Sequence, residues 1–223
     1  MDSFFWIWAR RFIMIAVPIT LVILEWNHPS GFSKNVYAGL MHMSGWWKNL
    51  HIIQSFLFGA VAVGAVFLTL GNNSLFGTLS KVFIWIFAVS YLVFDSTAGI
   101  AVGFILDMPN KSPDVDVESV KKIVQALYND PITGGSNSFF SLLGSYSWLF
   151  GIFSAIIAIF MANRGLALAK LLPPLIFLGI SAYALCVGHY APYGPIAFFS
   201  FAIASIWFEY FDFGPARPYK KFI

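Results

Sequence analysis

Four side chains of the types that bind metal ions lie in or beside long apolar segments of this sequence: His28, His51, Asp95 and His189. Asp95 is the only charged residue of the 24-residue segment 83–106. Such a segment is long enough to cross a bilayer, whose hydrocarbon core needs about 20 apolar residues. A carboxylate inside it costs about 2.5–3.5 kcal/mol on insertion scales, so it must face protein, water or a cation. No Lys or Arg lies at its depth in another apolar segment, which leaves a protonated histidine, a metal ion or a proton as its counter-charge.

The histidines offer ligands that would match this carboxylate. His28 follows the first apolar segment, His51 opens the second and His189 ends the fifth, so all three belong to the same end of the predicted bundle. Two or three imidazoles with one carboxylate suit zinc, copper or iron. The sequence therefore predicts a metal site made of His28, His51, Asp95 and His189 and buried between helices. An open coordination position there would make the protein a membrane-embedded metalloenzyme.

Two other interpretations fit the same residues. Haem b needs two ligands on facing helices, and His51 with His189 is the pair that the sequence offers. Alternatively, the buried polar residues only hold helices together. The chain is then a non-catalytic accessory or interaction subunit of a membrane complex. The pattern selects neither a substrate nor a reaction.

The composition indicates an integral membrane protein. Apolar residues make up 59% of the chain and charged residues only 10%, whereas soluble domains carry about 25% charged residues. The net charge of +3 comes from basic residues at helix ends, so we expect no nucleic-acid partner. Cys186 is the only cysteine, which excludes an internal disulfide and a cysteine-rich metal site. The 25 phenylalanines favour extensive contact with the lipid bilayer or with other membrane subunits.

We expect an all-α fold: a polytopic membrane bundle of six transmembrane helices that forms a single transmembrane domain over residues 1–223. The predicted spans are about 12–26, 47–70, 83–106, 139–161, 171–187 and 196–211. Segment 107–137 is predicted to be an outward loop with a short amphipathic helix at 116–129, where apolar residues recur at helical spacing. This helix either packs on the end of the bundle or forms a lid over the metal site.

The distribution of basic residues predicts the orientation of the bundle. Six spans place both termini on one side, and that side carries eight of the 13 Lys and Arg residues. Because cytoplasmic loops carry an excess of Lys and Arg, both termini are predicted to be cytoplasmic. The metal site then faces outward.

Four stretches of the sequence carry a resemblance. They are the His-Pro pair at 28–29, the Leu-His pair at 50–51, the run Phe-Asp-Ser-Thr-Ala-Gly-Ile-Ala-Val-Gly at 94–103, and the segment 189–196. In order and spacing they resemble a family of uncharacterised bacterial six-helix membrane proteins. The resemblance implies a multi-pass protein of the bacterial inner membrane, and it singles out His28, His51, Asp95 and His189. It implies no activity, since the family has none assigned.

Overall fold

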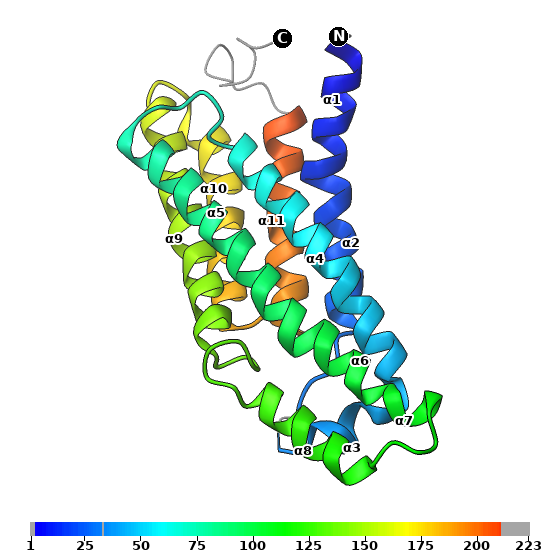
Figure 1. Cartoon of the computed structure of the whole chain (residues 1–223). Coiled ribbons are helices and arrows are strands. Elements are labelled where there is room, and N and C mark those ends of the chain that lie inside the picture. Colours follow the sequence, from blue (N-terminus) through cyan, green and yellow to red (C-terminus); the bar gives the residue numbers. More distant parts are fainter. Residues whose placement is uncertain (1–2, 33, 211–223) are drawn as a thin grey trace.

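The computed structural model describes residues 3–32 and 34–210, and within these ranges the chain is helical and has no β-strand. Five helices are long and apolar enough to cross a membrane: Phe4–Trp26, Val36–Phe67, Leu75–Lys111, Phe139–Ala162 and Leu168–Val187. They stand side by side in one elongated bundle (Figure 1). The all-α prediction is confirmed, and these apolar helices are those expected of a membrane protein.

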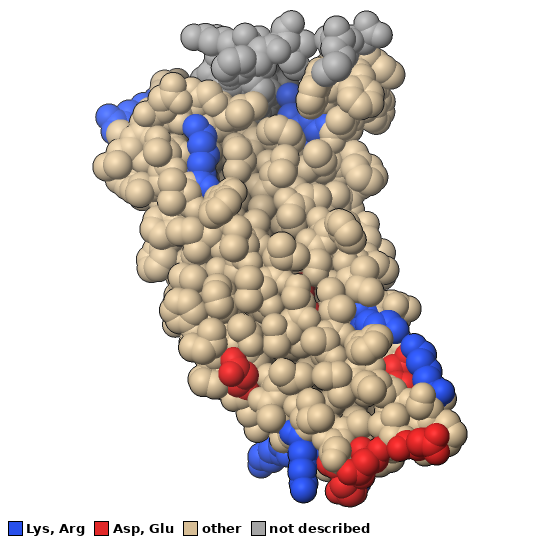
Figure 2. All heavy atoms as spheres, in the orientation of Figure 1, with Lys and Arg blue, Asp and Glu red and all other residues tan. Residues whose placement is uncertain are grey.

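The surface separates into an apolar middle and two charged ends. Figure 2 shows a broad band without Lys, Arg, Asp or Glu on most of its middle, with charged side chains above and below it. Large apolar side chains are exposed on the long helices, among them Phe56, Trp85 and Phe150. A surface of this kind matches contact with lipid hydrocarbon.

The first passage along the bundle is one continuous rod. It consists of α1 (Ser3–Arg11), the π-helical segment η1 (Phe12–Ala16) and α2 (Val17–Trp26). The sequence places the start of this span at about residue 12, but the helix begins nine residues earlier. Pro18 follows η1 without ending the helix. In η1 the Val17 N–H donates to the Phe12 carbonyl, and this wider turn accommodates the missing proline N–H.

The second and third passages are antiparallel neighbours that carry two of the four predicted ligands. The second comprises α3 (Val36–Leu40), η2 (Met41–Met43) and α4 (Ser44–Phe67). The third comprises α5 (Leu75–Phe94), the π-helical segment η3 (Asp95–Ala101), α6 (Val102–Leu106) and α7 (Met108–Lys111).

The third passage begins eight residues before the position predicted from the sequence. Ser74 caps α5, because its hydroxyl accepts a hydrogen bond from the Gly77 N–H at 3.2 Å. Lys81 lies inside the helix, and its ammonium group donates to the Asn72 carbonyl at 2.9 Å. A lysine near a helix end can therefore stay in the helix when its long side chain reaches a polar group at the interface.

The remaining helices complete the bundle and cover one of its ends. They are α8 (Val117–Tyr128), α9 (Phe139–Ala162), α10 (Leu168–Val187) and α11 (Tyr193–Tyr210). α8 lies across the lower end in Figure 1 and packs against α3 and α6. α11 runs along the bundle and packs against α2 and α10, although it is not among the five apolar helices named above.

Candidate functional site

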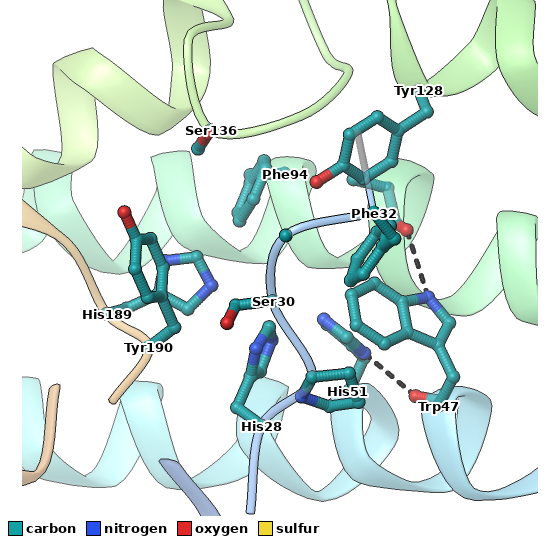
Figure 3. Close-up of a pocket in the computed structure, with 13 residues that line it drawn as sticks. His28, Ser30, Phe32, Trp47, His51, Phe94, Tyr128, Ser136, His189 and Tyr190 are labelled. Carbon is teal, nitrogen blue, oxygen red and sulfur yellow. Dashed lines mark hydrogen bonds between the residues drawn. The ribbon is translucent and has the colours of Figure 1, made fainter. Parts of the chain in front are cut away.

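Three histidines from three separate segments meet at the end of the bundle that α8 covers. His28 follows α2, His51 lies on α4, and His189 lies between α10 and α11. The ring centroid of His28 is 5.4 Å from that of His51 and 5.0 Å from that of His189. All three side chains are buried. We call them the histidine cluster, and Figure 3 shows their rings around one pocket.

His51 is held in a defined tautomer. Its Nδ1 lies 2.8 Å from the backbone carbonyl of Trp47, one turn earlier on α4. A carbonyl only accepts hydrogen bonds, so Nδ1 carries the proton and Nε2 keeps its lone pair. The Trp47 indole in turn donates to the Ala98 carbonyl at 3.2 Å, which ties α4 to η3 beside the histidine. The same pattern of one anchored and one free nitrogen is usual for metal-binding histidines.

His28 has the opposite property, because neither of its ring nitrogens has a hydrogen-bond partner within the described residues. Its backbone N–H donates to the Glu25 carbonyl at 3.2 Å, and this turn at the end of α2 directs the ring towards the other two histidines. Ring contacts, including one with Trp47 at a centroid distance of 5.1 Å, and an interaction with the Pro29 backbone hold the imidazole. The ring therefore combines burial with two polar atoms that need partners.

Burial keeps the two histidines outside the spans neutral. Desolvation lowers the pKa of His28 to about 4. Burial also lowers the pKa of His189 well below its usual value, and the neighbouring His28 and His51 add to the effect. Both imidazoles are therefore uncharged at pH 7, and this is the form that binds a metal ion.

The pocket beside the cluster has a volume of about 370 Å³ and is mainly aromatic. Trp47, Phe32 and Phe94 line it together with the histidines. Tyr128 at the end of α8 and Ser136 in the following loop form another part of its wall, as Figure 3 shows. The segment 107–137 thus both packs on the bundle end, through Val120 and Val124 of α8, and covers the pocket.

Asp95 lies near this site but not among the side chains that line the pocket. It is fully buried at the start of η3, and neither carboxylate oxygen has a hydrogen-bond partner among the described residues. It lies close enough to Glu25 of α2 for the two carboxyl groups to interact electrostatically. The structure therefore brings the three histidines together directly and places the fourth predicted ligand in a neighbouring acidic group.

Two residues of that group were missed from the sequence. Glu25 and Gln54 are both fully buried, and the Gln54 Nε2 donates to Glu25 Oε1 at 2.9 Å. We call Glu25, Gln54 and Asp95 the carboxyl–amide group. Glu25 lies three residues before His28, and Gln54 lies three residues after His51. His51 and Gln54 share a face of α4 at this spacing, so His51 could have identified Gln54. His28 lies past the end of α2, and no such helical signal points from it to Glu25.

The described part of the chain contains no set of three His, Cys, Asp or Glu side chains already arranged to hold a metal ion. The histidine rings are close, but their nitrogens do not converge on one point. Comparison of the chain with protein-family models, curated proteins and solved structures finds no match.

Proposed function

We propose that this chain is an integral membrane protein that binds one transition-metal ion through the histidine cluster, with Asp95 as a nearby compensating charge. The observation that supports this most is the meeting of three buried imidazoles from three segments, in which His28 contacts both of the other rings. Two imidazoles on one tetrahedral ion have ring centroids about 5 Å apart, because metal–nitrogen bonds are about 2.0–2.1 Å long. The two centroid distances from His28, 5.0 and 5.4 Å, match that spacing.

Loading of the site needs local movements, because among the described residues His51 and His189 each contact His28 but not each other and must come closer. The His28 ring must turn so that one of its nitrogens faces the nitrogens of His51 and His189. The turn breaks no hydrogen bond of good geometry among the described residues, although the ring also interacts with the backbone of Pro29. Nitrogen ligands of this kind select zinc, copper or iron over magnesium or calcium.

The same geometry favours an ion over haem b. Haem ligated by His51 and His189 would place a porphyrin plane between their rings. His28 contacts both rings, so it lies in that space. The pocket of about 370 Å³ instead leaves room beside an ion for water or a small substrate. An open coordination position is what distinguishes a catalytic zinc site from a structural one.

We further propose that α11 is a sixth span and that both termini are cytoplasmic. In Figure 1 the start of α1 and the end of α11 lie at one end of the bundle, and α8 lies at the other. The histidine cluster then lies near the outer face of a bacterial inner membrane, with α8 as the amphipathic helix of the outward loop. The excess of Lys and Arg at the end with the termini supports this orientation.

The proposal is tested by zinc binding to the full-length protein in detergent after chelator treatment. We expect one zinc per chain, and at least tenfold weaker binding in His189→Ala, since a tetrahedral site loses a ligand. His42→Ala is the matched control, because His42 is exposed in η2, outside the cluster. Wild-type protein without zinc, or equal binding by both variants, would contradict the proposal. A Soret band would indicate haem instead, and co-purification of a larger complex without metal would favour an accessory subunit.

A further inference from the structure

The carboxyl–amide group offers oxygen atoms that nothing in the described protein satisfies. Glu25 Oε2, Gln54 Oε1 and both carboxylate oxygens of Asp95 are buried without a hydrogen-bond partner among the described residues. All three side chains have an exposed fraction of 0%. Buried polar atoms are nearly always paired, so four unpaired oxygens in one place indicate something that the group binds.

Helix register places the three side chains together. A Cβ added at Gly103 would lie 2.8 Å from Lys48 Cβ, and one added at Gly99 would lie 2.1 Å from His51 Cγ. From the first contact to the second, the position moves back by four residues on the third passage, from Gly103 to Gly99. On α4 it moves forward by three residues, from Lys48 to His51. Asp95 precedes Gly99 by one more step of four residues, and it lies close enough to Glu25 for the two carboxyl groups to interact electrostatically. Gln54 donates to Glu25, so Glu25 links the other two side chains of the group.

No basic side chain among the described residues is placed to balance a negative charge on the group. The ion pairs found among the described residues join Arg or Lys to Glu209, Asp107 and Glu118, and none reaches Glu25 or Asp95. Taking two carboxylates out of water without a cation carries a large desolvation penalty. A divalent cation would balance both charges.

We infer that Glu25, Gln54 and Asp95 form a second cation site, which takes a hard divalent ion of the Mg²⁺, Mn²⁺ or Ca²⁺ class. Its donors are carboxylate and amide oxygens, which suit hard ions and not the softer ions that imidazoles prefer. This site goes beyond the metal site of the histidine cluster and uses none of its nitrogens. The protein would then hold an oxygen-ligated ion in addition to the nitrogen-ligated one.

Mn²⁺ is the probe for this site, because electron paramagnetic resonance distinguishes bound from free Mn²⁺. Full-length protein in detergent is stripped with chelator, given one equivalent of Zn²⁺ for the histidine cluster, and titrated with Mn²⁺. We expect one Mn²⁺ per chain, with no imidazole nitrogen coupling in the pulsed spectrum. No bound Mn²⁺, or a spectrum with imidazole coupling, overturns the inference.

Two variants locate the ion. Glu25→Gln, which keeps the side-chain shape, should weaken Mn²⁺ binding at least tenfold and leave Zn²⁺ binding unchanged. Gln54→Leu tests the amide oxygen and should weaken Mn²⁺ binding several-fold if Glu25→Gln does not fold. Unchanged Mn²⁺ affinity in a folded variant overturns the inference.

This experiment tests the zinc site and the second cation site independently of each other. His189→Ala should lose Zn²⁺ and keep Mn²⁺. Protein that binds Zn²⁺ but no Mn²⁺ contradicts the second site alone. Protein that binds Mn²⁺ through oxygen ligands but no Zn²⁺ supports the second site and contradicts the histidine site.

Discussion

Gly99→Ala should destabilise the protein by about 1–3 kcal/mol, as overpacking of a close-packed interior does, and should weaken zinc binding at least tenfold. A Cβ at Gly99 would lie 2.1 Å from His51 Cγ and 2.5 Å from His51 Cβ. Rotation of the imidazole cannot relieve the second contact, because the His51 Cβ is fixed by the α4 backbone. η3 and α4 must separate, and His51 then moves away from His28. The thermal unfolding midpoint in detergent and the zinc affinity measure both effects.

Gly59→Ala is the matched control for this substitution. Gly59 lies on α4, two helical turns after His51, and a Cβ there meets no atom within 4 Å. Alanine favours a helix over glycine by about 1 kcal/mol, so the unfolding midpoint should stay equal or rise. If Gly99→Ala behaves like Gly59→Ala, the close approach of η3 to His51 is wrong.

Arg10→Met should cost about 3–5 kcal/mol of stability, since it leaves a buried carboxylate without its main partner. Arg10 Nε and Nη2 donate to the two oxygens of Glu209, each at 2.8 Å. The Glu209 side chain has no exposed area, and that of Arg10 is 11% exposed. This pair joins α1 to α11 at the end of the bundle opposite the histidine cluster. Unfolding in detergent should therefore be much easier, while zinc affinity in the folded protein stays unchanged.

Two controls separate the loss of the ion pair from other effects. Arg11→Met removes a longer contact of 3.6 Å to Glu209 and the cation–π contacts of Arg11 with Trp8 and Tyr210, and it should cost much less. The double variant Arg10→Met with Glu209→Gln should recover much of the lost stability, because no buried charge remains unpaired. A double variant less stable than Arg10→Met alone would show that the pair acts in another way.

The sequence predicts the helices well because each apolar run is long and uninterrupted. α9 starts at Phe139 as predicted and ends within one residue of the predicted end. The first and third passages are longer than predicted because the local sequence pattern places a helix boundary at charged residues that the helices in fact continue past. Arg10 continues its helix by pairing with Glu209, and Lys81 does so by reaching a loop carbonyl. Both partners depend on tertiary structure, which a local pattern does not contain.

The candidate site is only partly predictable for the same reason. The cost of a charge in an apolar segment identifies Asp95 from one residue and its surroundings. The location of His28, His51 and His189 at one end follows from counting spans. The link between Glu25 and Gln54 joins α2 to α4, and only packing of these helices determines it. Asp95 lies near Glu25 and is not among the residues that line the pocket. This position likewise depends on how η3 packs against α4.

The most direct test of the histidine site is zinc K-edge X-ray absorption on the zinc-loaded full-length protein in detergent. The account predicts three imidazole nitrogens per zinc at about 2.0–2.1 Å, with the outer-ring scattering typical of histidine. His28→Ala should reduce that scattering by one imidazole or abolish zinc binding. A zinc shell made only of oxygen, or the same imidazole count in wild type and His28→Ala, would contradict it.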